Sequence, residues 1–276
     1  MPDSTVGNTP KSSGVDPVRR PGCPDLGFWC PPNYTAIPMA HWIGTSGYNY
    51  PEWRGSFYPE KFPAAKMLEY YAERFNTVEV NYTFYRMPTE KQLAGWAATT
   101  PASFVFTLKA PRRITHDSKL QNCEETVATF CATARTLGDR LGVLLFQLPP
   151  TFRRSVAVLE QFLACLPEGT RAAFEFRHAS WHDDEVYTAL RRRNAALCIA
   201  DSEKMSTPPV VTADYGYLRL RDEGYDDADI ARWAEEIRRL AGSWRDVFVY
   251  FKHEEQGVGP RLATQLREML QGEPAR

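Results

Sequence analysis

Short runs of apolar and β-branched residues recur from position 41 onward, and segments with helical spacing lie between most of them. Eight runs predict strands: His41–Ser46, Thr77–Thr83, Ser103–Lys109, Leu141–Gln147, Arg171–Arg177, Ala195–Asp201, Tyr215–Arg221 and Val247–His253. Helical spacing predicts helices over Ala64–Phe75, Glu124–Leu137, Ser155–Leu166, Glu185–Asn194, Asp229–Leu240 and Arg261–Leu270, and an extra one over Thr89–Ala97. The connection Ser202–Asp214 shows no helical pattern.

Alternating strands and helices are typical of parallel βαβ units, and eight such units can close into a barrel. We therefore predict an α/β fold of the (β/α)8 TIM-like barrel type, forming a single domain over residues 41–272. An open doubly wound sheet is the main alternative, and it usually carries a glycine-rich phosphate turn after its first strand. The turn Gly44-Thr45-Ser46-Gly47-Tyr48 fits neither a P-loop nor a dinucleotide fingerprint.

Residues 1–40 differ from the rest of the chain. They contain eight of the 21 prolines, many small polar residues and no apolar periodicity. A segment of this kind buries too little apolar surface to offset its ordering entropy. We predict a disordered, proline-rich extension, and Met39 is a hypothetical alternative start.

Overall charge limits the classes of partner, and cysteine usage indicates the cellular compartment. The 33 basic and 34 acidic residues leave a formal charge of −1, which does not indicate nucleic acid or a membrane surface, although a local basic patch would be compatible with nucleic acid. There is no apolar stretch of about 20 residues and no secretory signal. The six cysteines form no C-x-x-C pair, which is typical of reduced thiols, and we predict a cytoplasmic protein.

Charged or amide side chains stand at almost every predicted strand end. Because side chains alternate between the two faces of a strand, polar residues among apolar neighbours are expected to face the barrel mouth, where such folds place their chemistry. These residues are Glu79, Asn81, Lys109, Gln147, Glu175, Arg177, Asp201, Arg219, Arg221, Lys252 and His253.

This pattern favours an enzyme that acts on a small or oligomeric anionic substrate, with phosphate-bearing compounds as candidates, by hydrolase- or lyase-type chemistry. Glu79, Glu175 and Asp201 are the acid/base candidates, and Lys109, Arg177 and Arg219 are the candidate anion clamp. His116, after the third strand, is a further acid/base candidate or a capping residue. Ion pairs such as Glu175 with Arg219, or Glu79 with Lys109, would alternatively only close the barrel top.

Other functions stay open at this point. A metal-assisted phosphodiesterase would need ligands from separate strands, such as Glu79, Glu175, Asp201 and His253, and neighbouring cations would compete for them. We therefore predict no bound metal and no cofactor. A non-catalytic binding protein is the alternative from another class. The aromatic loop 48–58 could form a wall that stacks on a ligand, and it could equally form a hydrophobic lid over the barrel rim. The glycines of loop 257–261 could form a phosphate site or a simple turn.

An ordered set of motifs resembles the domain-of-unknown-function-72 family, also called YecE-like. The motifs are Ile43–Gly47, Trp53–Tyr58, Tyr71–Tyr85, Lys109–His116, Leu141–Pro150, Glu175–Trp181, Tyr217–Leu220 and Tyr250–Lys252. The resemblance implies a TIM-like barrel but no reaction. It adds Tyr85 and Trp181 to the candidate substrate-binding residues. Many members carry His-Gly where this chain has Arg221-Asp222, and an Asn pair where it has Lys252-His253, so ligand contacts on that side are expected to differ.

Overall fold

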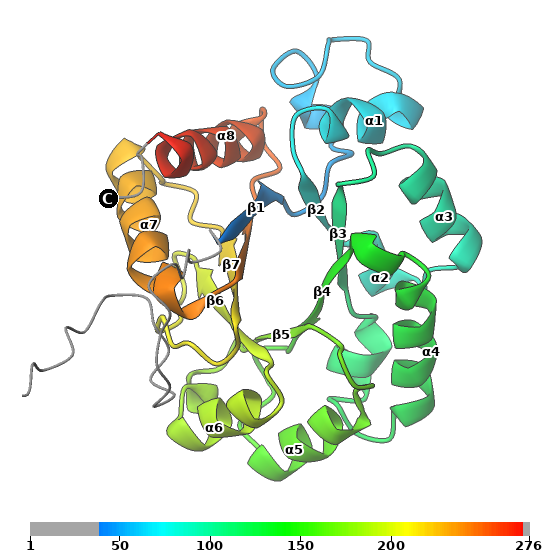
Figure 1. The fold of residues 1–276 in the computed structure, drawn as a ribbon, viewed down its shortest axis with the longest axis vertical. Coiled ribbons are helices and arrows are strands. Elements are labelled where there is room, and N and C mark those ends of the chain that lie inside the picture. The colour runs from blue at the N-terminus through cyan, green and yellow to red at the C-terminus, as the bar shows by residue number, and fades with distance from the viewer. Residues whose placement is uncertain (1–38, 273–276) are drawn as a thin grey trace, which may run out of the picture. The chain divides into compact units, whose positions relative to one another are not determined.

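A ring of eight parallel strands with helices on its outside forms the described part of the protein (Figure 1). The computed structural model describes residues 39–272, so residues 1–38 of the extension predicted over residues 1–40 lie outside the described residues. The strands are β1 (Ala40–Thr45), β2 (Thr77–Val80), β3 (Val105–Lys109), β4 (Leu141–Gln147), β5 (Ala172–Glu175), β6 (Ala196–Asp201), β7 (Tyr215–Leu220) and β8 (Asp246–Phe251). The helices are α1 (Met67–Ala72), α2 (Tyr82–Tyr85), α3 (Glu90–Ala98), α4 (Glu124–Arg135), α5 (Val156–Cys165), α6 (Asp184–Arg192), α7 (Asp227–Leu240) and α8 (Val258–Gln271).

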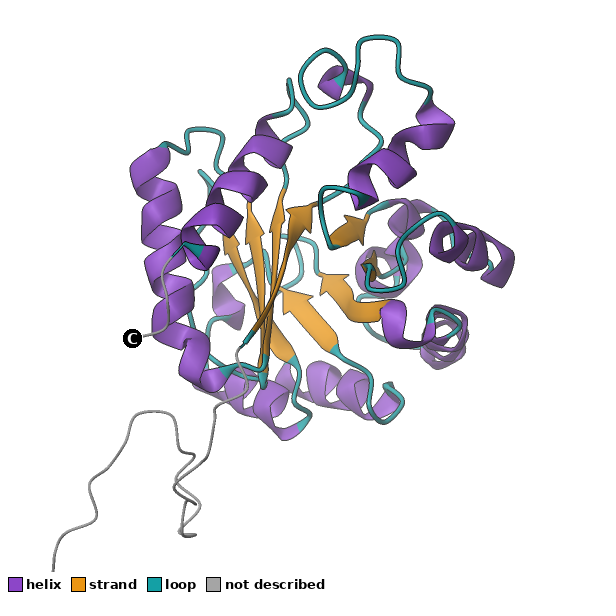
Figure 2. Cartoon of the chain, turned by 45° about the horizontal axis from the view of Figure 1, so that its top comes forward, coloured by secondary structure: helices purple, strands orange, loops and turns teal. Residues whose placement is uncertain are grey.

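Strands pair in the order β1-β8-β7-β6-β5-β4-β3-β2, and all of these pairings are parallel (Figure 2). The predicted TIM-like barrel is therefore confirmed. Parallel strands buried on both faces require covering helices, which explains why the strand sequences read as nearly continuous apolar runs.

The barrel closes between β1 and β2, and this seam differs from the other strand contacts. A single bridge pairs Ser46 with Glu79. Nearer the N-terminal ends of the two strands, the side chain of Asn76 replaces backbone pairing. Its Nδ2 donates to the carbonyl of His41 at 2.8 Å, and its Oδ1 accepts from the N–H of Ile43 at 3.3 Å. We call this contact between β1 and β2 the seam.

A tyrosine hydroxyl bridges the middle of the seam. Tyr71, on α1, accepts a hydrogen bond from the N–H of Thr45 at 2.8 Å and donates one to the carbonyl of Thr77 at 3.1 Å. Gly44 leaves room for this arrangement, because a Cβ at that position would lie 2.3 Å from the Thr77 carbonyl oxygen. The seam is therefore held largely by side chains.

Aromatic and hydroxyl side chains fill the inside of the barrel. Tyr250 bridges Thr77 and Thr107 through hydrogen bonds of 2.8 Å to each, and the hydroxyl of Tyr215 bonds to the backbone of Ala172 on β5. These bonds cross the barrel and identify the inward-facing positions of each strand. The inward positions of β7 are 215, 217 and 219, and those of β6 are 196, 198 and 200.

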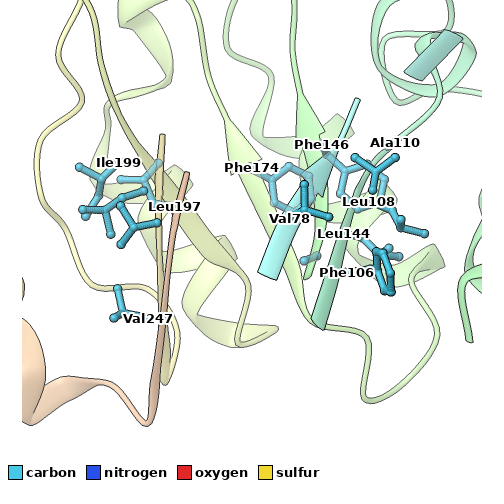
Figure 3. Packing of buried hydrophobic residues seen from close by; sticks show 14 of the residues in the cluster. Val78, Phe106, Leu108, Ala110, Leu144, Phe146, Phe174, Leu197, Ile199 and Val247 are labelled. Atoms are coloured by element: carbon cyan, nitrogen blue, oxygen red, sulfur yellow. The ribbon is translucent and has the colours of Figure 1, made fainter. Parts of the chain in front are cut away.

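A larger apolar layer separates the strands from the helices. Figure 3 shows part of it, where Phe146 and Phe174 from the neighbouring strands β4 and β5 stack with their ring centres 5.3 Å apart. The predicted amphipathic stripe of α5 enters this layer through Leu159 and Phe162. This layer faces away from the inside of the barrel, so alternate residues on each strand serve two different cores.

Two predicted elements differ in the structure. The second strand, expected over Thr77–Thr83, ends at Val80 because a helical turn begins at Tyr82. Thr83, within that turn, donates to the carbonyl oxygens of Val80 and Lys109. The helix expected as an extra one is α3, the regular β2–β3 crossover, and α2 is the additional helix. The connection 202–214 contains no helix, as predicted.

Candidate active site

The C-terminal ends of the strands bring five polar residues together inside the barrel. Each stands at an inward position: Ser46 after β1, Glu79 on β2, Gln147 on β4, Glu175 on β5 and Arg219 on β7. All five side chains are buried. We call this set the buried network.

Arg219 is the centre of the buried network. Its Nε and Nη2 donate to Oε1 of Glu79 at 3.1 and 2.8 Å, its Nη1 donates to Oε2 of Glu175, and its Nη2 also lies 3.1 Å from the hydroxyl of Ser46. Gln147 donates to Glu175 at 2.7 Å. One guanidinium group therefore holds two buried carboxylates from two separate strands, β2 and β5.

The electrostatics of the network keep Glu175 and Arg219 charged. Burial alone would raise the pKa of Glu175, but Arg219, Arg177 and the hydrogen bond from Gln147 hold it well below its usual value. Burial would lower the pKa of Arg219, but Glu175 and Glu79 raise it well above its usual value. A carboxylate held in this way is a poor proton donor or acceptor near neutral pH, so it stabilises the charge arrangement.

Four half-buried cations surround the network, and we call Lys109, Arg177, Arg221 and Lys252 the rim. Arg177 donates through Nε to Glu175 at 2.9 Å, and Nη1 of Arg221 lies 3.9 Å from the same carboxylate. The two guanidinium side chains are 29% and 28% exposed. Ligands in solution can therefore reach the rim, whereas the buried network fills the space beneath it.

Lys109 has the most unusual environment on the rim. Its ammonium group lies 4.3 Å from the centre of the Phe84 ring. Among residues 39–272, no Asp or Glu oxygen lies within 4.0 Å of it, because Glu79 and Glu175 pair with arginines. Burial and then the charge of Arg219 lower the pKa of Lys109 to about 7. The expected Glu79–Lys109 ion pair is absent from these residues.

His116 contacts the same aromatic side chain as Lys109. Its ring meets Phe84 edge-on at 5.0 Å, and its Nδ1 shares a hydrogen bond of 2.9 Å with the hydroxyl of Thr115. Burial, followed by the charges of Lys109 and Arg177, lowers the pKa of His116. The residue belongs to a π-helical turn, η3 (Arg113–Asp117), a local geometry that often occurs at functional sites.

Replacing Lys109 with methionine is expected to raise the free energy of unfolding by about 1–3 kcal/mol at pH 6. The folded pKa of Lys109 is about 7, below its unfolded value. Below pH 7 both states are protonated, so the folded protein carries the full cost of a buried ammonium group. Between about pH 7 and 10 only the unfolded state stays protonated, so the wild-type protein gains stability and the advantage of the variant shrinks.

Urea unfolding at pH 6 and pH 9 measures this effect. The exposed Lys91→Met is the control, and its effect should be the same at both pH values. A Lys109→Met variant that is destabilised equally at pH 6 and pH 9 would show that Lys109 does not carry a destabilising charge.

Two predicted site residues face away from the buried network. Asp201 ends β6 at an outward position, because Cys198 and Ala200 take the inward ones. Its carboxylate accepts a hydrogen bond of 2.8 Å from the hydroxyl of Tyr225. His253 likewise follows β8 on its outer side and bonds through Nε2 to a backbone carbonyl at 2.7 Å. The expectation that Asp201 and His253 converge with the other charges is wrong, because a strand end fixes position but not direction.

Three further candidates take other positions. Trp181 is buried, donates to the carbonyl of Phe152 at 2.7 Å and stacks on Phe176, so it packs between loops. Tyr85 is 80% exposed on α2. Asn81 is near the network: its Nδ2 donates to the hydroxyl of Ser46 at 2.8 Å, and its buried Oδ1 has no partner among the described residues.

Sequence reasoning missed three participants. Ser46 donates to one oxygen of the Glu79 carboxylate, and the hydroxyl of Tyr217 donates to the other. The ring of Phe84 contacts both Lys109 and His116. The same period-two rule that selected Arg219 would have selected Tyr217 two residues earlier. Phe84 had no such signal, because it lies beyond the strand that was predicted to end at Thr83.

Loops 48–58 and 257–261, for which the sequence allowed two interpretations each, are both well packed. In the aromatic loop, Trp53 and Tyr58 are buried, and their rings stack at 6.2 Å, which fits the lid interpretation. Gly257 has a φ of 73° and a Cβ there would lie 2.6 Å from the Ser56 hydroxyl, while a Cβ on Gly259 would meet the His253 carbonyl oxygen at 3.0 Å. Both glycines therefore have a packing reason.

Other features of the described residues lie outside this site. Three cavities of about 360, 100 and 400 Å³ are lined by residues that belong to neither the buried network nor the rim. Within residues 39–272, no three His, Cys, Asp or Glu side chains are grouped so that they could hold a metal ion. None of the described helices is long and apolar enough to cross a bilayer. Cys123, Cys131, Cys165 and Cys198 are free thiols.

Comparisons with known proteins identify relatives along most of the chain. The sequence model of the family described as "Protein of unknown function DUF72" matches residues 42–276. The UPF0759 protein YecE of Escherichia coli K12 is 33% identical over 141 residues, which cover 49% of this chain and 52% of that protein. The alignment thus spans about half the length of that relative. The UPF0759 protein YunF of Bacillus subtilis is 24% identical over 78% of this chain and 90% of that protein.

Solved structures agree with the barrel. A DUF72 family protein from Thermotoga maritima has a TM-score of 0.74 and 27% identity, over 84% of this chain and all of that one. A DUF72 family protein from Enterococcus faecalis has a TM-score of 0.72 and 20% identity, over 85% of this chain and 97% of that one. The names of these proteins state no reaction.

Proposed function

The chain belongs to the DUF72 family, and on that premise we propose that it is an enzyme that binds a small anionic substrate on the rim and performs acid/base chemistry there. The rim lies at the C-terminal ends of the strands, the end of the barrel where enzymes of this fold place their active sites.

The excess of positive charge carries the proposal. In the network and on the rim, the guanidinium groups of Arg177, Arg219 and Arg221 meet only two carboxylates, those of Glu79 and Glu175. Cations gathered in excess are costly to bury unless an anion compensates them.

The rim cations also destabilise one another. After burial, the charge of Arg219 is the largest cause that lowers the pKa of Lys252, and Arg177 and Arg219 lower that of Arg221. A bound anion would reverse this effect, because it favours the protonated forms. Lys252 is partly compensated by Glu254, whose oxygen lies 3.6 Å from it.

A phosphate or carboxylate suits the two arginines. Arg177 and Arg221 both present planar guanidinium groups near Oε1 of Glu175, and such groups bind these anions through two parallel hydrogen bonds. The buried Nε of Arg221 has no hydrogen-bond partner among the described residues.

The acid/base groups of the proposal are Lys109 and His116. Glu79 and Glu175, named as candidates from sequence, are fully engaged by Arg219, and Asp201 bonds to Tyr225. Lys109 has a pKa of about 7, which is the range that suits a general base or acid at neutral pH.

Phosphate and sulfate are expected to stabilise the protein, and the rim arginines are expected to be responsible. At about 100 times the dissociation constant, an anion adds roughly 2.7 kcal/mol to the free energy of unfolding, or about 5 °C or more in Tm. Arg177→Ala and Arg221→Ala should start within a few degrees of the parent, because Glu175 keeps Arg219 and Gln147 as partners. Both should lose most of the anion-induced shift.

The control is Arg192→Ala, which removes an exposed arginine paired with Glu160. It should keep the full shift in Tm. A parent protein that no anion stabilises would show that the charges only hold the barrel together. Turnover is tested with a panel of phosphorylated compounds followed by NMR, with Lys109→Met as the inactive comparison. Anion binding without turnover of any compound would favour a non-catalytic binding protein.

A further inference from the structure

The proposed anion site does not require Lys109. Its ammonium group stands at the end of β3 against the Phe84 ring, and no carboxylate among residues 39–272 lies within ion-pair distance. Arg177 and Arg221 supply the charge for an anion without it. Lys252, also at a strand end, is paired with Glu254. The two rim lysines are therefore not equivalent.

The surroundings of Lys109 favour the neutral amine. Burial and the charge of Arg219 act against its protonated form, so that a large fraction is unprotonated at neutral pH. A neutral amine has a free electron pair and is a nucleophile, whereas an ammonium group is not. A lysine in apolar, cationic surroundings is a typical arrangement for attack on a carbonyl carbon.

We propose that Nζ of Lys109 forms an imine with the carbonyl carbon of an aldehyde or ketone substrate whose anionic group binds Arg177 and Arg221. This inference rests on the anion site proposed above. It names the substrate class as small carbonyl compounds that carry a phosphate or carboxylate.

The step balances with groups present on the rim. The amine electron pair forms a C–N bond, and the electrons of the C=O double bond move to oxygen. Nitrogen loses a proton and the oxygen gains one, which gives a carbinolamine. A second proton, taken up from solvent, lets the oxygen leave as water, and a protonated imine remains. His116, which shares the Phe84 ring with Lys109, can take the proton from nitrogen and return it to oxygen.

A protonated imine withdraws electrons from the neighbouring carbon. Breaking a C–H or C–C bond at that carbon then becomes easier, which is the chemistry of lyases and isomerases. No oxidant or reductant is needed. The imine would thus give the acid/base chemistry of the rim a defined electron sink.

Reductive trapping tests the imine directly. The full-length protein is incubated at pH 7 with dihydroxyacetone phosphate or with pyruvate, in the presence of cyanoborohydride, which reduces an imine to a stable secondary amine. Peptide mass spectrometry then locates the modified lysines. We expect Lys109 to be modified at least about tenfold faster than Lys252 or the exposed Lys91. Intact Lys109→Arg protein should lose only this fast modification.

The pH profile and competition separate the inference from the anion site. Modification of Lys109 should level off just above pH 7, whereas that of Lys91 should keep rising toward pH 10. Inorganic phosphate should slow the modification of Lys109 by the phosphorylated probe but not by uncharged acetone.

Each proposal fails in its own way. If Lys109 reacts no faster than Lys252 while phosphate still raises Tm through Arg177 and Arg221, the imine is wrong and the anion site stands. If Lys109 reacts equally fast with acetone and dihydroxyacetone phosphate and no anion raises Tm, the amine is nucleophilic but the anion site is wrong, and with it the substrate class.

Discussion

Arg219→Met is expected to lower the free energy of unfolding by about 3–5 kcal/mol, because it leaves two buried carboxylates without their main partner. Glu79 and Glu175 are both buried, and Arg219 contacts both of them. Urea unfolding measures the loss. The matched control is Arg232→Met, which removes an exposed arginine paired with Asp229 and should cost less than about 0.5 kcal/mol.

The pH dependence of this variant has a definite sign. Without Arg219, burial of Glu175 is less opposed, so its folded pKa is expected to rise above its unfolded value of about 4.3. Such a group contributes stability below the unfolded pKa and loses it as pH rises through the folded pKa. The deficit of Arg219→Met should therefore be smaller near pH 5 than near pH 8.

Neutral substitutions of the two glutamates provide a second check on the buried network. Adding Glu79→Gln and Glu175→Gln to Arg219→Met removes the orphaned charges and should recover part of the lost stability. A loss below about 1 kcal/mol for Arg219→Met alone would mean that water reaches these carboxylates, contrary to their burial in the structure.

Tyr71→Phe is expected to cost about 2–3 kcal/mol, because it leaves the N–H of Thr45 and the carbonyl of Thr77 without their bridging partner. The ring itself stays, so packing is preserved and the loss reports on the hydroxyl. The neighbouring Tyr70→Phe is the control and should change stability by less than about 0.5 kcal/mol.

Hydrogen exchange locates the effect of Tyr71→Phe. The amide of Thr45 should exchange faster in the variant, and amides in the pairing between β7 and β8 should be unaffected under conditions of local opening. Equal acceleration across all strands would indicate global destabilisation and contradict a local role of the hydroxyl.

The barrel could be predicted because its signal is distributed along the chain. Parallel strands covered by helices produce apolar runs alternating with amphipathic segments, and one uncertain element does not change the count. Thr83 shows the limit: its β-branched side chain favours strand, but its hydroxyl caps the end of β2 by bonding to Val80 and Lys109. Local propensity was overridden by a tertiary contact.

The site was only partly predictable, for two physical reasons. Asp201 follows an inward-facing Ala200, so a one-residue difference in register puts its carboxylate outside the barrel. The environment of Lys109 could not be read from sequence either, because Arg219 reaches two carboxylates and leaves the lysine without an ion-pair partner among residues 39–272. Pairing of this kind depends on side-chain length and barrel width.

The side-chain bridges of the seam have a consequence for association between molecules. A closed barrel has no edge strand, and an edge strand with free N–H and C=O groups is a template for pairing with another chain. Opening the seam would expose two such edges, on β1 and on β2, at once. The hydroxyl of Tyr71 and the amide of Asn76 therefore protect the protein from edge-to-edge aggregation as well as closing its barrel.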